Sequence, residues 1–231
     1  MSTSKVADEV SARVALPIVT AVVCMNAGFI GLGAVFDYPR VLSRPSAEVL
    51  SLFRAHEAAV VSWFSVLVFG AVLFVPIAVL VGRLHDSPHM RWAVRAGAAA
   101  GVVQAIGLLR WPLLVPSLAD RAVGTGESSA ATAEFELWNR VLGSALGETC
   151  GYALTAAWTV LVATALSRNG FPRWFTTLGV AAAILILTGV AAPWRVPAAQ
   201  QLNFLGYVLW SVWMLALAGF VIHRSPPISR A

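Results

Sequence analysis

The stretch AAVVSWFSVLVFGAVLFVPIAVLVG, from Ala58 to Gly82, decides the fold because none of its 25 residues carries a charge. A helix needs about 20 mainly apolar residues to cross the hydrocarbon core of a bilayer. A run of this length therefore predicts a transmembrane helix rather than the buried helix of a soluble domain.

The composition of the whole chain agrees with this interpretation. Of its 231 residues, 58% are hydrophobic and 12% are charged, and the mean hydropathy is +0.78. A soluble domain carries about 25% charged residues. The composition indicates a membrane protein, and it excludes collagen-like, disulfide-rich and disordered chains as well as an ordinary cytosolic enzyme.

Five further stretches have the length and hydropathy of a span. The six predicted spans cover residues 13–36, 58–82, 92–116, 140–166, 175–192 and 202–223. The sequence therefore predicts an all-α fold, a polytopic bundle of six transmembrane helices that forms one domain over residues 1–231.

The distribution of basic residues predicts the orientation. Six passes leave both termini on one side, which holds nine Lys and Arg residues against six on the other, with Arg110 inside a span. The positive-inside rule then places both termini in the cytoplasm, and we expect a multi-pass protein of the plasma membrane. Because the basic residues sit at span ends and form no patch, we expect no nucleic-acid partner.

Two connections on the predicted outer side have distinct patterns. Residues 46–57 place Val49, Leu52, Phe53 and His56 on one helical face, which predicts a helix at the interface or an extension of the second span. Residues 124–133 are small and polar, and they predict an exposed loop.

Small residues predict how two of the helices pack. The third span carries Ala93, Gly97, Gly101 and Ala105 at intervals of four, and the fourth carries Gly143, Gly147 and Gly151. Because small residues let helix backbones approach closely, these ridges predict a tight helix pair. Alternatively, the glycines make room for a ligand.

A faint repeat links the third and fifth spans. The segments RWAVRAGAAA from Arg91 and RWFTTLGVAAA from Arg173 share an Arg-Trp pair and a glycine at the seventh place. A duplicated helical hairpin would produce this pattern, and so would the common needs of a helix that starts at the inner interface.

Arg110 is the strongest functional signal, because an Arg at the bilayer centre costs about 2.5–3.5 kcal/mol and usually faces a partner or a cavity. It lies about 9 Å below the outer end of its predicted span, and Glu148 lies about 12 Å below the outer end of the next. We therefore expect the two side chains to face each other.

Further polar and aromatic side chains accumulate near the same depth, which predicts a polar cavity open to, or just beneath, the outer surface. Alternatively, an Arg110–Glu148 pair with nearby hydroxyls is only internal stabilisation. The candidate ligand-binding residues are Arg110, Glu148, Tyr152, His56, Glu57, Asn26, Asn203 and Trp111.

The histidines do not predict a metal centre. His85, His89 and His223 fall on the same predicted side, but Ser87-Pro88 breaks the helix that would align the first two. All four histidines lie at span ends, which disfavours a transmembrane bis-His haem. We expect no metal site and no cofactor.

Three segments carry a family resemblance: LLRWPLLVPSLA at Leu108, LGETCGYALTAAWT at Leu146 and NFLGYVLWSVWMLA at Asn203. Through them the chain resembles a bacterial family of six-helix integral membrane proteins that is classed only as a domain of unknown function. The resemblance implies six helices, covers about the C-terminal two thirds, and supplies no activity or site residue.

These observations leave three hypotheses for function. The leading one is binding or transport of a small anionic or amphipathic molecule, with Arg110 as its anchor and Glu148 as counter-charge or proton carrier. The second is an intramembrane enzyme acting on a lipid or isoprenoid, with Glu148 or Glu57 as general acid/base and His56 assisting. The third is an accessory subunit whose small-residue ridges bind another membrane protein.

Overall fold

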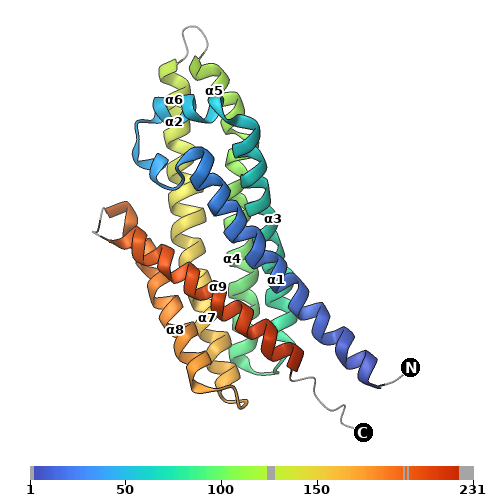
Figure 1. Ribbon diagram of the computed structural model, residues 1–231. Coiled ribbons are helices and arrows are strands. Elements are labelled where there is room, and N and C mark those ends of the chain that lie inside the picture. Colours follow the sequence, from blue (N-terminus) through green and yellow to red (C-terminus); the bar gives the residue numbers. More distant parts are fainter. Residues whose placement is uncertain (1–2, 124–127, 195, 197, 224–231) are drawn as a thin grey trace. The chain divides into compact units, whose positions relative to one another are not determined.

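The computed structural model describes residues 3–123, 128–194, 196 and 198–223, and this part of the chain holds helices and no strand. Its elements in chain order (Figure 1) are α1 Thr3–Phe36, η1 Arg40–Ser43, α2 Ser46–Ala55, α3 Glu57–Gly82, α4 Pro88–Leu113, α5 Val115–Val123, α6 Ser128–Trp138, η2 Asn139–Cys150, α7 Gly151–Ser167, α8 Arg173–Thr188, η3 Gly189–Trp194 and α9 Ala199–His223.

Among the residues that the structure describes, six helical segments are long and apolar enough to cross a membrane. They run over Ala12–Phe36, Glu57–Gly82, Pro88–Ala122, Ser128–Ser167, Arg173–Ala192 and Ala199–His223. The prediction of an all-α membrane protein with six spans is therefore confirmed. Arg195, Arg224 and Arg230, which enter the charge count, lie outside the described residues.

The predicted loop over 124–133 is wrong in its second half. Residues 124–127 lie outside the described part of the chain, but α6 already begins at Ser128. Ala131 and Phe135 of this helix are buried, so its apolar side chains hold it against neighbouring elements. Small polar residues therefore indicated a loop where tertiary packing favours a helix.

The chain divides into two compact units, each with its own core. The first unit comprises Met1–Val22, Leu73–Ala100 and Tyr152–Ala231, and the second comprises Val23–Val72 and Gly101–Gly151. Three helices, α1, α3 and α4, contribute residues to both units.

Tryptophans form the core of the first unit, where α8 and α9 lie side by side (Figure 1). The indole nitrogen of Trp213 donates to the Phe175 carbonyl at 3.1 Å, and the two rings stack with centroids 5.1 Å apart. The indole nitrogen of Trp210 donates to the Thr159 hydroxyl at 2.9 Å. These bonds give both indole N–H groups an acceptor, which the hydrocarbon core of a bilayer cannot provide.

The two segments of the faint repeat pack in the same way. A Cβ atom added to Gly97 would lie 2.5 Å from the Trp158 ring, and one added to Gly179 would lie 2.6 Å from the Trp213 ring. Each shared glycine thus makes room for an indole of the following span. This equivalence favours the duplicated hairpin over the common needs of a helix start.

The core of the second unit lies around Trp111, and α2, α5 and α6 pack against one another within this unit (Figure 1). The predicted helix after the first span is present as α2, which buries Val49, Leu50 and Phe53. His56 was expected on the same face, but it ends the helix as its C-cap and is exposed.

The predicted glycine ridge of the fourth span contacts α4, but through a different face of α4 from the one expected. A Cβ atom added to Gly107 would lie 2.8 Å from the Cα atom of Gly147. Gly143 lies against Arg110, and Gly151 lies against Gln104. The face of α4 that meets the ridge is therefore Gln104, Gly107 and Arg110, whereas Gly97 packs on Trp158 and Ala78.

The fourth span contains a π-helical segment, η2, from Asn139 to Cys150. Its i→i+5 hydrogen bonds hold more residues in each turn than an α-helix does, and such segments often occur at functional sites. Side chains in residues 139–150 therefore do not follow the i, i+4 spacing of an α-helix.

Candidate functional site

Arg110 is buried in the second unit, with 5% of its surface exposed. Its Nη1 atom donates to the Gly107 carbonyl one turn earlier in α4, and its Nη2 atom donates to Asn139 Oδ1 at 3.1 Å. The guanidinium also forms a hydrogen bond with the Tyr38 side chain. These three oxygen atoms belong to neutral groups, so they orient the guanidinium and leave its charge in place.

The local sequence explains why the guanidinium stays inside. A Cβ atom on Gly143 would lie 2.8 Å from Nη2 of Arg110 and 3.0 Å from Oδ1 of Asn139. The missing side chain therefore provides the space that the fork of donors occupies. Pro112 follows two residues later, inside the last turn of α4.

Trp111 is fully buried beside this cation. Its ring stacks on Phe64 with centroids 4.6 Å apart and an interplanar angle of 6°, and Arg110 Cζ lies 5.3 Å from the Trp111 ring. Its indole nitrogen has no hydrogen-bond partner. Four more rings surround the indole at centroid distances of 5.3–6.5 Å: Phe36, Tyr38, Phe53 and Phe135.

Tyr38 follows the end of α1 and brings its hydroxyl to Arg110. Its ring packs edge-on against Phe64 at 5.3 Å. Burial raises the pKa of Tyr38 to about 12, with the negative charge of Glu148 acting in the same direction and Arg110 opposing it. The phenol is therefore neutral at physiological pH and can donate or accept a hydrogen bond.

Glu148 lies on η2, is partly buried, and interacts electrostatically with Arg110. Asn139 and Tyr38 occupy hydrogen-bonding positions around the same cation.

Two of the other predicted site residues belong to the first unit. Asn203 is 8% exposed and donates to the Ile186 carbonyl at 2.7 Å, which links α9 to α8. Tyr152 packs edge-on against Tyr207 at 5.8 Å, and its ring fills the space beside Gly189. Their described contacts hold helices together within that unit.

The remaining three predicted residues lie on the second unit, away from its core. His56 and Asn26 are exposed. Glu57 forms an ion pair with Arg54, which also reaches Asp120 at 2.9 Å. A carboxylate engaged by an exposed arginine is a poor candidate for a general base, so this geometry does not favour the enzyme hypothesis built on Glu57.

In the part of the chain that the structure describes, no three His, Cys, Asp or Glu side chains form a group that could hold a metal ion. His85 and His89 flank Asp86, whose carboxylate accepts a hydrogen bond from Arg91 at 3.2 Å.

One family model matches nearly the whole chain. A family model described as "Domain of unknown function (DUF4386)" matches residues 15–221. The chain belongs to this family. No curated protein and no solved structure matches it.

For this DUF4386 chain, the family match includes every residue of the Arg110 site, since Tyr38, Asn139 and Glu148 all fall between residues 15 and 221. The predicted membership of a six-helix membrane family without an assigned activity is therefore confirmed. The DUF4386 description names no substrate, so any ligand has to be inferred from the residues of the site.

Sequence analysis missed Tyr38 and Asn139. Asn139 was placed just before the fourth span, but the helix begins at Ser128 and carries it inside. Asn139 directly precedes Arg140, the first residue of the predicted fourth span, so its position in the sequence suggests an interfacial residue. Tyr38 follows a helix end, and no periodic pattern indicates that the chain there turns toward α4.

The arrangement combines a fixed cation, an aromatic wall and a carboxylate. A guanidinium with oriented donors can bind a carboxylate or phosphate group, and aromatic rings beside it can pack against an apolar substituent. A carboxylate nearby can balance the cation when no anion is bound.

Proposed function

We propose that this DUF4386 protein binds a small anionic or amphipathic molecule at Arg110, as a binding protein or as one step of transport. The observation that carries the proposal is that neutral oxygens of Gly107, Asn139 and Tyr38 hold the buried guanidinium. These groups fix the direction of the donors, and they do not cancel the positive charge. In a low-dielectric environment that charge attracts an anion strongly.

Glu148 is the second part of the proposed site. Its negative charge acts on Arg110, so it repels an anion that approaches the same guanidinium. Removing this charge should strengthen anion binding, whereas removing the Arg110 charge should abolish it. These opposite changes in anion affinity distinguish a ligand site from an Arg110–Glu148 pair whose role is only structural.

The test measures thermal unfolding in detergent with matched amphiphiles. Decanoate supplies a carboxylate on an apolar chain, and decyltrimethylammonium supplies the same chain with the opposite charge. The wild type is compared with Arg110→Gln and with Arg40→Gln, which removes an exposed positive charge from the same unit. A ligand at ten times its Kd stabilises the folded state by about 1.4 kcal/mol.

We expect decanoate to raise the unfolding temperature of the wild type and of Arg40→Gln, and to leave Arg110→Gln unchanged. The cationic amphiphile should stabilise none of them. Glu148→Gln should show a larger decanoate shift than the wild type, which provides a readout even when Arg110→Gln does not fold. Equal shifts with both amphiphiles, or a smaller shift in Glu148→Gln, would contradict the proposal.

The proposed location is the plasma membrane, with both termini in the cytoplasm. The excess of nine basic residues over six supports this orientation. The Arg110 site would then lie in the extracytoplasmic half of the bilayer, because Arg110 is near the C-terminal end of α4 and the proposed inner connection precedes its N-terminal end.

A further inference from the structure

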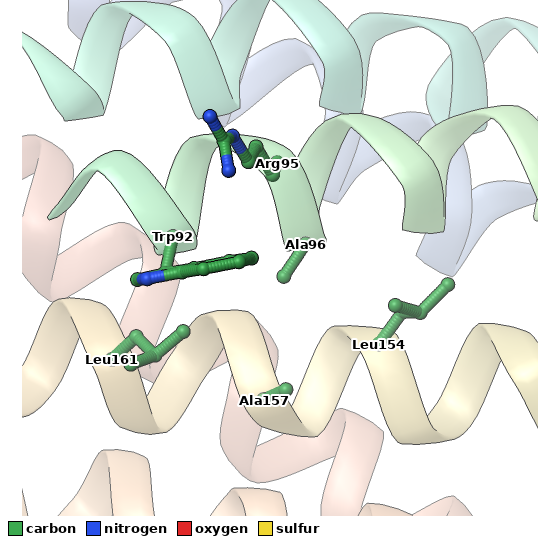
Figure 2. Close-up of a pocket in the computed structure, with 6 residues that line it drawn as sticks. All are labelled: Trp92, Arg95, Ala96, Leu154, Ala157 and Leu161. Carbon is green, nitrogen blue, oxygen red and sulfur yellow. The ribbon is translucent and has the colours of Figure 1, made fainter. Parts of the chain in front are cut away.

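A groove in the first unit is formed by α4 and α7, and its lining is apolar. Helix α4 contributes Trp92 and Ala96, and α7 contributes Leu154, Ala157 and Leu161 (Figure 2). The groove has a volume of about 420 Å³. Along α7 it extends from Leu154 to Leu161, a distance of about 10 Å.

A cation and an aromatic ring lie beside the groove, and the Arg95 guanidinium points away from α7 (Figure 2). Arg95 is the one charged residue among the six that line the groove, and its Cζ atom lies 4.8 Å from the Trp92 ring centroid. Trp92 is 60% exposed. In Figure 2 its ring extends from α4 toward α7, over Leu161 and Ala157.

The groove lies near one end of its span. Helix α4 begins at Pro88, so Trp92 and Arg95 are about 6 and 10 Å along the helix from its first residue. Exposed tryptophans concentrate at the membrane–water interface, and a long Arg side chain can extend its charge toward the headgroups. The apolar part of the groove continues from there toward the middle of the span.

We infer that this groove binds an anionic phospholipid, with one acyl chain along Ala96, Ala157 and Leu154 and the headgroup phosphate at Arg95. The groove matches such a molecule in two ways, because its lining is apolar and the charged side chain beside it, Arg95, is positive. A guanidinium suits a phosphate through its planar array of donors. A zwitterionic lipid carries an ammonium group that a nearby guanidinium repels.

The faint repeat provides a comparison inside the same chain. Aligned from the Arg-Trp pair, Arg95 corresponds to Thr177 at the start of α8. Trp174 is exposed, like Trp92, but no cation stands three residues after it. Arg173, which precedes Trp174, is therefore a suitable control for a general effect of positive charge beside a tryptophan.

The experiment is native mass spectrometry of the detergent-purified protein, titrated with dioleoyl phosphatidylglycerol or with dioleoyl phosphatidylcholine. The variants are Arg95→Gln, Ala157→Phe and the control Arg173→Gln. Arg95, Ala157 and Arg173 are all exposed, so the substitutions leave the packed core intact. We expect the wild type to bind phosphatidylglycerol first and with a defined stoichiometry.

Arg95→Gln should weaken phosphatidylglycerol binding about fivefold and leave phosphatidylcholine unchanged, as expected for one basic group near anionic lipid. Ala157→Phe fills the groove and should reduce the binding of both lipids, whereas Arg173→Gln should behave like the wild type. The inference is overturned if the wild type binds both lipids equally, if Arg95→Gln and Arg173→Gln have equal effects, or if Ala157→Phe retains full binding.

Discussion

At the scale of single residues, the second unit depends on Trp111, which combines full burial with an indole nitrogen that bonds to nothing. Such a residue contributes through its apolar surface and its stacking on Phe64, and the polar N–H contributes only a desolvation cost. The indole also provides one wall of the Arg110 site, so its size matters more than its donor.

Two substitutions of Trp111 should therefore differ sharply. Trp111→Phe keeps a stacked ring and removes the unsatisfied donor, and we expect a loss of less than about 1.5 kcal/mol in the free energy of unfolding. Trp111→Ala leaves a large cavity and should cost about 3–5 kcal/mol. Unfolding by denaturant in detergent measures both, and similar losses in the two variants would contradict this account.

Because of Tyr38, the free energy of unfolding should decrease at alkaline pH. Its pKa of about 12 in the folded protein exceeds the ordinary value of 10.0, so folding favours the neutral phenol. The resulting stabilisation is fully present below pH 10 and is lost as the pH rises from 10 to 12. Relative to Tyr38→Phe, the wild type should lose up to about 3 kcal/mol over this interval.

Unfolding measured for both proteins at several pH values from about 9 to 12 tests this expectation, because other titrating groups are common to the pair. A constant difference between them would show that Tyr38 titrates at its ordinary pKa.

Sequence reasoning found the central residues of the candidate site and missed its supports. A lone arginine inside an apolar run is visible without coordinates, because its insertion cost demands a reason. Asn139 and Tyr38 are ordinary residues at the ends of apolar runs, and only tertiary structure brings their oxygens to the guanidinium.

At the scale of elements, α4 and η2 bring backbone atoms into direct contact at Gly107 and Gly147. Gly107 and Gly147 approach so closely that an added Cβ atom would lie within 3.3 Å of the opposite Cα atom. A backbone cannot move aside as a flexible side chain can, so this contact should tolerate no additional methyl group.

Gly107→Ala should therefore destabilise the protein by about 1–3 kcal/mol. The matched control is Gly219→Ala in α9, where nothing lies within 4 Å of the added Cβ atom. That change should be neutral or should stabilise by up to about 1 kcal/mol, because alanine favours helix more than glycine does. Thermal unfolding of both variants in detergent measures the difference, and equal effects would exclude the close contact.

Sequence patterns predicted where the helices lie in the chain better than they predicted which face of each helix meets its neighbour. Hydropathy depends on composition along a segment, so all six spans were found. Which face of a helix meets its neighbour depends on the local pitch, and η2 departs from the α-helical repeat assumed for residues 139–150. The glycines of the fourth span were correctly predicted to pack on α4, but the opposing face was not.

At the scale of the whole molecule, the charge distribution predicts that both termini are cytoplasmic. Single cysteines introduced at two exposed serines test this orientation after Cys24 and Cys150 are replaced by alanine. Ser43→Cys should react with a membrane-impermeant maleimide in intact cells, and Ser167→Cys should react only after the membrane is opened. The reverse pattern would place both termini outside.

The paired contacts of Gly97 with Trp158 and of Gly179 with Trp213 have a consequence for how this chain can vary. In each pair the glycine has only a hydrogen atom in place of a side chain, and the indole ring of the tryptophan fills the space that this leaves. A larger residue at either glycine becomes acceptable only together with a smaller ring opposite, so neither position can drift alone. Substitutions here should therefore arise as compensating exchanges between adjacent crossings of the membrane.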